Sequence, residues 1–175
     1  MRLRGVHHVE INVIDYENSI KFYDRMFGWL GYSSFSTLEI EYVGIYYYAF
    51  PHSYIGIQPA KSNNALDFEE WRPGINHIAL HAKNRKEINK FYEQFLLKEN
   101  ITILYPPQEY LYTPGYYAVF FIDPSGIKWE LAHFSFIPTP WSIYKWWKLF
   151  GAERKKHPEW KRHPFFESIR KLPKA

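Results

Sequence analysis

Residues 6–13 alternate between apolar and polar side chains, which is the pattern of a strand whose two faces meet different surroundings. Val9, Ile11 and Val13 fall on the apolar face, and His8 opens the polar one. The apolar face is expected to pack on the helix that follows, and the polar face to look into a cavity.

The same pattern returns 69 residues later, which predicts that one structural unit is used twice. Residues 75–82 repeat the strand, with His77 in the place of His8. At the same offset and without a gap, residues 90–93 then repeat residues 21–24. Two histidines at equivalent points of equivalent strands are a plausible basis for a metal site.

A second match, at an offset of 72, pairs residues 50–60 with residues 122–132 and places Gln58 opposite Glu130. The change from 69 to 72 needs three extra residues in the second copy. An insertion of that size is expected in a connecting loop.

A helix is predicted after each strand. Asp15 and Asn84 are suitable N-cap residues, because a short side-chain oxygen accepts from an unpaired backbone N–H of the first turn; Glu87 completes a capping box with Asn84. Gly28 is expected to end the first helix in a left-handed conformation. Apolar residues at helical spacing predict the buried faces, which are Ile20, Phe22, Tyr23, Met26 and Phe27 in the first helix and Ile88, Phe91, Tyr92, Phe95 and Leu96 in the second.

Three short strands are expected to complete each copy, because β-branched and aromatic residues are enriched there. Their ranges are 33–41, 43–50 and 54–59 in the first copy and 101–105, 116–122 and 127–134 in the second. Each copy therefore reads β-α-β-β-β. The chain is predicted to be an α+β protein of two such modules, residues 1–62 and 73–134, which form a cupped mixed sheet with the helices outside.

The C-terminal extension, residues 135–175, has a different character. A helix is predicted from Ser142 to Phe150, with Thr139 as its cap and Gly151 as its end. Residues 1–133 carry 12 Lys and Arg against 15 Asp and Glu, whereas residues 134–175 carry 10 against 3. One interpretation is nucleic-acid binding through interleaved cations and aromatic rings. The other, which we favour because the repeat has no nucleic-acid motif, is that the aromatic residues pack on the acidic body.

Composition limits the chemistry of the chain. It has 175 residues, of which 21% are aromatic, and no cysteine, so a metal would be held by nitrogen and oxygen ligands. No apolar run approaches the roughly 20 residues of a membrane span, and the N-terminus has no signal-peptide core. We therefore expect a cytoplasmic protein without a membrane partner.

Four residues are candidates for one metal centre: His8, Gln58, His77 and Glu130. Glu130 stands between Trp129 and Leu131, and an inward-facing carboxylate there needs a partner such as a cation. The donors suit one divalent ion, Zn, Ni, Co, Mn or Fe. If Gln58 does not bind the metal, the remaining ligands are two His and one carboxylate, which is the facial triad of non-haem iron oxygenases. His81, four residues after His77 and on the same face of the predicted strand, is a candidate proton carrier, and Glu130 is a second catalytic candidate.

At these residues the chain resembles the vicinal oxygen chelate superfamily, which includes glyoxalases, bleomycin-resistance proteins and extradiol dioxygenases. The resemblance rests on His8 and His77, on the Phe-Tyr pairs of both helices and on the closing segment 121–131, and it covers about residues 4–134. It implies two modules curved around one divalent metal with ligands from both. The order His, Gln, His, Glu is similar to methylmalonyl-CoA epimerase, and the subset without Gln to extradiol dioxygenases and fosfomycin-resistance enzymes. An epimerase would need a further carboxylate, for which Glu39 and Glu41 are candidates.

Two functions remain open at this point. The first is a metal-dependent lyase, isomerase or dioxygenase whose small oxygen-rich substrate chelates the metal. The second is a non-catalytic binder of an aromatic ligand or drug, of the bleomycin-resistance type, which the tyrosines of residues 46–48 and 110–112 suggest. The modules pair either within one chain or between the two chains of a homodimer.

Overall fold

The computed structural model describes residues 6–38, 43–49, 53–61, 74–134 and 139–156. The candidates Glu39 and Glu41, and the tail aromatics Trp160, Phe165 and Phe166, lie outside the described residues.

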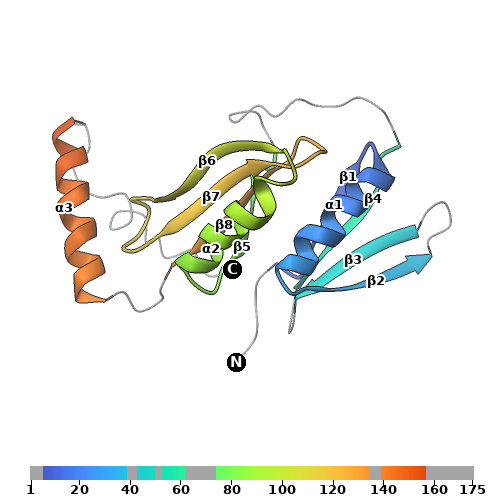
Figure 1. The fold of residues 1–175 in the computed structure, drawn as a ribbon, viewed down its shortest axis with the longest axis horizontal. Helices are drawn as coiled ribbons and strands as arrows, with labels where there is room; N and C mark the ends of the chain where they lie inside the picture. Colours follow the sequence, from blue (N-terminus) through green and yellow to red (C-terminus); the bar gives the residue numbers. More distant parts are fainter. Residues whose placement is uncertain (1–5, 39–42, 50–52, 62–73, 135–138, 157–175) are drawn as a thin grey trace, which may run out of the picture.

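The first module contains one helix and one four-stranded sheet (Figure 1). In chain order its elements are β1 (His8–Val13), α1 (Tyr16–Trp29), β2 (Ser33–Leu38), β3 (Val43–Ala49) and β4 (Ser53–Pro59). The strand order in the sheet is β1-β4-β3-β2, in which β1 runs parallel to β4 and the other neighbours are antiparallel. Every element that the alternation pattern predicted for this module is present.

The second module repeats this topology. Its elements are β5 (Ile78–His81), α2 (Arg85–Phe91) continued by the π-helical turn η1 (Tyr92–Leu96), β6 (Thr102–Glu109), β7 (Tyr117–Ile122) and β8 (Lys128–His133). The strand order is β5-β8-β7-β6, again with the first strand parallel to the last. The predicted α+β fold of two β-α-β-β-β modules is thus confirmed, with two separate mixed sheets among the described strands.

Both helices begin at the predicted caps. The Asp15 carboxylate accepts from the backbone N–H of Asn18 at 3.2 Å, and the Asn84 amide oxygen accepts from that of Glu87 at 3.0 Å. The expected role of Gly28 was wrong: α1 continues through it to Trp29, and Gly31 takes the left-handed conformation with φ 81°. Sequence allows either glycine to end the helix, and packing of the last turn selects the later one.

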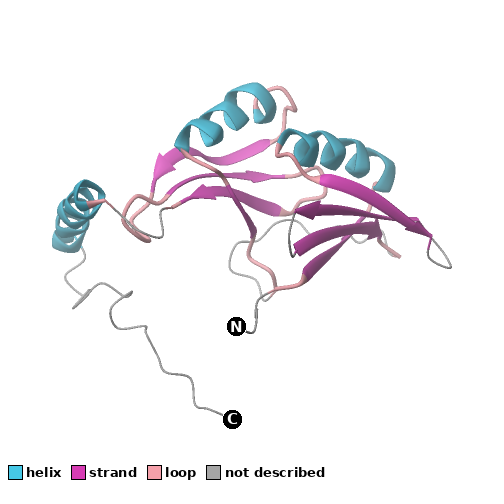
Figure 2. Ribbon diagram, turned by 90° about the horizontal axis from the view of Figure 1, so that it is seen from below, coloured by secondary structure: helices cyan, strands magenta, loops and turns pink. Residues whose placement is uncertain are grey.

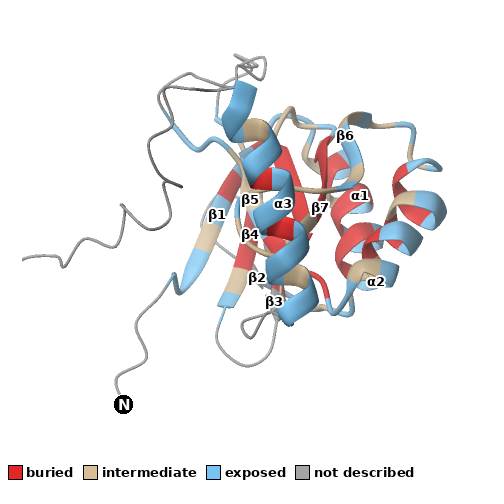
Figure 3. Ribbon diagram, turned by 90° about the vertical axis from the view of Figure 1, so that its left-hand side faces the viewer, coloured by how far each residue is buried: buried red, intermediate tan, exposed pale blue. Residues whose placement is uncertain are grey.

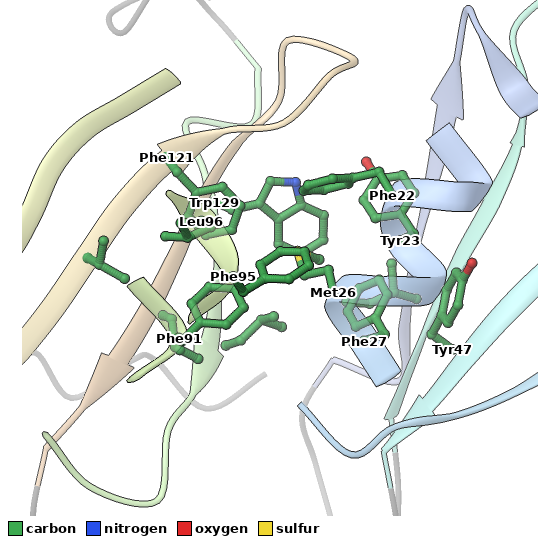
Figure 4. Packing of buried hydrophobic residues seen from close by; sticks show 14 of the residues in the cluster. Phe22, Tyr23, Met26, Phe27, Tyr47, Phe91, Phe95, Leu96, Phe121 and Trp129 are labelled. Carbon is green, nitrogen blue, oxygen red and sulfur yellow. The ribbon is translucent and has the colours of Figure 1, made fainter. Parts of the chain in front are cut away.

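The two modules share one hydrophobic core. The helices lie on the same side of the sheets (Figure 2), and α1 packs toward α2 and β8. Figure 4 shows Tyr23, Met26 and Phe27 of α1 facing Phe95 and Trp129 of the second module. These five side chains are almost completely buried, so that burial of apolar surface joins the two modules.

Asp123 adds a polar clamp inside this core. Its carboxylate accepts from the Tyr23 hydroxyl of α1 and from the Trp129 indole N–H at 2.7 Å. The backbone N–H groups of Ser125 and Ile127 donate to its other oxygen, which fixes the turn between β7 and β8. Burial raises the pKa of Asp123, and these four donors oppose that rise by stabilising the ionised form.

The sheet registers show where the second copy is longer. Val9 pairs with Ile55 and Ile78 pairs with Trp129, so the offset between equivalent residues is 69 in the first strands and 74 in the last. The predicted offset of 72 was therefore wrong by two residues. A shift of two preserves the alternation of faces, which is why the pattern alone did not exclude it.

Three of the five extra residues lie at a connection, as predicted, and the other two lengthen β6. β6 has eight residues against six in β2, and the β6–β7 connection, residues 110–116, has seven against four between β2 and β3. The β6–β7 connection has a second role, because it carries the docking site of the C-terminal helix.

That helix, α3 (Pro140–Lys156), lies beside the β6–β7 connection at the far end of the second module (Figure 1). The Thr139 hydroxyl accepts from the backbone N–H of Ser142 at 3.2 Å, which confirms the predicted cap. The helix does not end at Gly151 as predicted but passes through it, because a glycine inside a helix costs only about 1 kcal/mol.

The docking of α3 is both apolar and ionic. Trp146 and Phe150 are buried, and the Trp146 indole N–H donates to the backbone oxygen of Leu111 at 3.0 Å. The Glu109 carboxylate forms ion pairs with Lys145 of α3 and with Arg85 of α2. Burial alone would raise the pKa of Glu109, but these two cations hold it below its usual value. The expectation that the aromatic residues of the extension pack on the body is confirmed for Trp146 and Phe150, and it is wrong for Trp141, Tyr144 and Trp147, which are exposed.

Candidate metal centre

His77 and Glu130 meet on the face of the second sheet that is turned away from α2, here called the open face. Trp129 and Leu131 of β8 point into the core, and alternation along the strand therefore sends Glu130 to the open face. His77 precedes β5, and its Nε2 lies 3.0 Å from Oε2 of Glu130. The Glu130 side chain is only 2% exposed, and His77 is partly exposed.

Two aromatic side chains hold this pair. The Tyr116 hydroxyl donates to Oε1 of Glu130 at 2.7 Å, and burial together with that hydrogen bond raises the pKa of Tyr116. The Phe120 ring packs edge-on against the His77 ring, with centroids 5.6 Å apart. One carboxylate oxygen is thus oriented by a hydroxyl, and the other faces the imidazole.

The pair fits a divalent metal ion. Nitrogen and oxygen ligands lie about 2.1 Å from such an ion, and two ligands at right angles are then about 3.0 Å apart. The Nε2–Oε2 separation of 3.0 Å equals that spacing, and it is also the length of a direct hydrogen bond between the imidazole and the carboxylate. A buried carboxylate with one hydroxyl and one imidazole as partners is also the donor chemistry that such ions prefer.

His8 is not brought to this pair within one chain. It opens β1, where its ring stacks on Tyr54 with centroids 4.7 Å apart, and its Nδ1 lies 2.8 Å from that of His7. Its Nε2 is 3.9 Å from Glu10. Within the part of the chain that the structure describes, no three His, Asp or Glu side chains are grouped closely enough to hold a metal ion.

Gln58 lies on the same face as His8 but near the other end of the strands. It pairs with Asn12, whereas His8 pairs with Tyr54. The two residue pairs are four residues apart along the strands, which is a distance of about 13 Å. The sheet register instead makes Gly56 the counterpart of Glu130, because Gly56 pairs with Glu10 as Glu130 pairs with Ala79. The first module thus has no side chain at the position that Glu130 occupies in the second.

This architecture agrees with comparisons to known proteins. The family model described as Glyoxalase/Bleomycin resistance protein/Dioxygenase superfamily matches residues 5–131. The chain belongs to this superfamily. A putative glyoxalase from Bacillus halodurans has a similar structure, with 33% identity and a TM-score of 0.59 over 73% of this chain and 93% of that one.

Two further proteins are similar to this chain at lower identity. The uncharacterized protein YqjT of Bacillus subtilis (strain 168) is 27% identical over 72% of this chain and 96% of its own length. The fosfomycin resistance protein FosX from Listeria monocytogenes shares the fold, with 15% identity and a TM-score of 0.56 over 77% of this chain and 97% of that one. The superfamily match ends at residue 131, so α3 lies outside it.

Other residues contribute to the open face of the second sheet. His81 is exposed at the end of β5, with its ring 5.7 Å from that of Phe134. Lys128 is buried two residues before Glu130, with its ammonium group 5.2 Å from the Phe120 ring centroid and 5.9 Å from that of Tyr105. The open face therefore combines a carboxylate, an imidazole, an ammonium group and several aromatic rings.

Sequence reasoning missed Tyr116, Phe120 and Lys128 as parts of this site. The alternation of faces along β8 could have indicated Lys128, because it precedes Glu130 by two residues and therefore shares its face. Phe120 shares this face because it pairs with Glu130 across β7 and β8. Tyr116 comes just before β7 and reaches Glu130 through its long side chain.

Proposed function

We propose that the chain is a divalent-metal enzyme of the glyoxalase and dioxygenase type, acting on a small oxygen-rich substrate. The observation that carries this proposal is the pairing of His77 with the buried Glu130 at the spacing of two metal ligands. A metal bound there would act as a Lewis acid on a substrate that chelates it through adjacent oxygens.

The residues around the pair have separable roles in this proposal. His77 and Glu130 hold the metal, and the hydrogen bond from Tyr116 keeps the Glu130 carboxylate turned toward it. Lys128 places positive charge on the same face, which suits a substrate rich in oxygen. His81 lies four residues beyond His77, in reach of a larger substrate, as the group that would carry a proton.

The third ligand in this proposal is His8 of a second copy. β1, which begins at His8, and β5, which follows His77 directly, are each at the edge of their sheet among the described strands. Edge strands carry unpaired backbone groups that another chain can meet. Placing β1 of one copy along β5 of another would bring His8 toward His77 and Glu130 and complete two His and one carboxylate.

A metal-free binding protein is the second candidate function. Tyr110 and Tyr112 are stacked with centroids 5.4 Å apart, and Tyr116 is stacked on Phe134. These rings could hold a flat aromatic ligand, and Glu130 already has Tyr116 and His77 as partners without a metal.

Metal analysis of single variants and of their mixture tests the proposed centre. Protein purified without chelator should contain one divalent ion per chain, and His8→Ala, His77→Ala and Glu130→Gln should each lose it. If two copies share each site, an unfolded and refolded equal mixture of His8→Ala and His77→Ala should regain about a quarter of the sites, because half the dimers carry one intact pair of modules. Metal content unchanged in Glu130→Gln would refute the proposal.

A turnover screen separates the enzyme from the binder. Metal-loaded protein is offered the methylglyoxal–glutathione adduct, catechols and acyl-CoA thioesters, and the Glu130→Gln variant serves as the control. Metal-dependent turnover that this variant loses supports the enzyme. Ligand binding that is equal in the wild type and in Glu130→Gln, without turnover, supports the binder.

A further inference from the structure

α3 exposes large aromatic side chains on the side turned away from the body. Trp141 is 69% exposed, Tyr144 57% and Trp147 61%, and Ile143 and Leu149 are exposed as well. Figure 3 shows this side of the helix coloured largely as exposed. Single exposed apolar residues are ordinary, whereas Trp141, Tyr144 and Trp147, spaced three residues apart on one side of the helix, form a patch that indicates an interaction surface.

The outward side also carries positive charge. Trp141, Tyr144, Lys148 and Lys155 follow one another at spacings of three, four and seven residues, so they lie along one stripe. Residues 139–156 carry five Lys and Arg against one Glu. Residues 1–133, with 12 Lys and Arg against 15 Asp and Glu, are slightly acidic, so the positive charge of the chain lies in the C-terminal extension, of which this helix is part.

The docking of α3 fixes which side faces outward. Trp146 and Phe150 are buried and the Trp146 indole is bonded to Leu111, so the helix cannot turn to bury Trp141 and Tyr144 without breaking these contacts. Lys145 reinforces the orientation through Glu109. The aromatic and basic stripe is therefore presented by the folded protein as a fixed surface.

We infer that α3 is a peripheral docking helix for an anionic lipid surface. Trp and Tyr prefer the interface between headgroups and acyl chains, and neighbouring Lys and Arg attract the negative headgroups of anionic lipids. Among the described residues, no helix is long and apolar enough to cross a bilayer, so α3 would lie in the plane of the interface. α3 lies outside the superfamily match, and no residue of its outward stripe belongs to the proposed metal centre.

Ile143 and Leu149 lie three residues before and after the buried Trp146, so they border the docked side of the helix and are not part of the outward stripe. The stripe itself combines Trp and Tyr with Lys, which is the combination that interfacial helices place at the level of anionic headgroups. Two copies of α3 packed through this face would bring Lys148 and Lys155 of each copy together, and like charges oppose that arrangement.

Vesicle flotation of the full chain tests the inference. The probes are vesicles of phosphatidylcholine alone and of phosphatidylcholine mixed with phosphatidylglycerol. The chain should float with the anionic vesicles only, and less so at high salt. Trp141→Ala/Tyr144→Ala/Trp147→Ala should reduce partitioning at least about tenfold, and Lys148→Glu/Lys155→Glu should reduce it roughly 30-fold. Lys21→Glu/Lys98→Glu, the same charge change on exposed positions away from α3, is the matched control and should float like the wild type.

The remaining outcomes overturn the inference. All substituted side chains are exposed, so the circular dichroism spectrum and the melting temperature of each variant should equal those of the wild type. Loss of flotation in a variant that passes this control is then due to the changed surface and not to unfolding. Equal flotation of the two variants and the wild type would show that α3 is not the contact. Absence of flotation, together with retention of a single-stranded oligonucleotide or with a dimer that the aromatic variant loses, would assign the face to nucleic acid or to a second copy.

Discussion

At the scale of the residue, the two buried carboxylates of the second module differ in what surrounds them. Asp123 accepts from four donors, which satisfy its oxygens and make it part of the core. Glu130 faces only the Tyr116 hydroxyl and the His77 imidazole. A carboxylate in the first environment stabilises a fold, whereas one in the second still has lone pairs for a cation.

We predict that Tyr116→Phe weakens metal binding about 10- to 100-fold, because the hydrogen bond that orients Glu130 is lost while the ligand itself remains. Competition with a chelator measures the affinity. Tyr117→Phe is the matched control, since the neighbouring hydroxyl bonds to Asn89 of α2 on the other face of the sheet. Equal affinities in the two variants would contradict the assigned role of Tyr116.

We predict that Asp123→Asn lowers the free energy of unfolding by about 3 kcal/mol, because an amide nitrogen would face the buried Trp129 indole N–H or the turn. Tyr23→Phe removes one donor and leaves the carboxylate with three, so its cost should be only about 1.5 kcal/mol. Urea denaturation measures both. A loss in Asp123→Asn no larger than that in Tyr23→Phe would count against the clamp.

At the scale of the element, the insertion in the second module and the C-terminal helix form one substructure. The β6–β7 connection presents Leu111 to Trp146, and β6 ends at Glu109, which Lys145 and Arg85 both contact. The connection also carries Tyr110, and Tyr116 follows at its end beside Glu130. The docking site of α3 and the aromatic rings beside Glu130 therefore lie on the same connection.

We predict that Trp146→Ala weakens the docking of α3 by about 3 kcal/mol or more, since it removes a buried aromatic ring and its hydrogen bond. Hydrogen exchange of residues 140–156 should accelerate accordingly. The adjacent Trp147→Ala, which removes an exposed ring, should change the free energy of local opening measured by exchange by less than about 0.5 kcal/mol. Equal protection in the two variants would show that α3 is held by other contacts.

At the scale of the whole molecule, the two modules depend on each other. The shared core takes side chains from α1 and the first sheet as well as from α2, β7 and β8. Phe27 is fully buried and contacts both Tyr47 of its own sheet and Trp129 of the other module. Neither module could be removed without exposing this surface to water.

We predict one cooperative unfolding transition for both modules, with Phe27→Ala lowering the free energy of unfolding by about 4 kcal/mol. Tryptophan fluorescence and far-UV circular dichroism in urea should shift together. Leu97→Ala, at a position that is 55% exposed, should cost less than about 1 kcal/mol. Two resolved transitions would show that the modules unfold separately.

The sequence by itself determined the local structure of this protein and its repetition. Alternation in residues 6–13 and 75–82, caps at Asp15 and Asn84, and helical stripes are properties of short segments, and each predicted element is present where residues are described. The superfamily followed from the same segments together with the closing stretch 121–131. Periodicity fixes the face on which a side chain lies, because the strand repeat is two residues.

Only the tertiary structure decided register and proximity. A shift of two residues leaves the alternation unchanged, so the pairing of Gly56 with Glu10, and hence the distance of Gln58 from His8, was set by long-range pairing of strands. The meeting of Glu130 with His77 and Tyr116, the passage of α3 through Gly151 and the exposure of its aromatic stripe likewise depend on contacts between distant segments. Those contacts are a property of packing, which no local pattern contains.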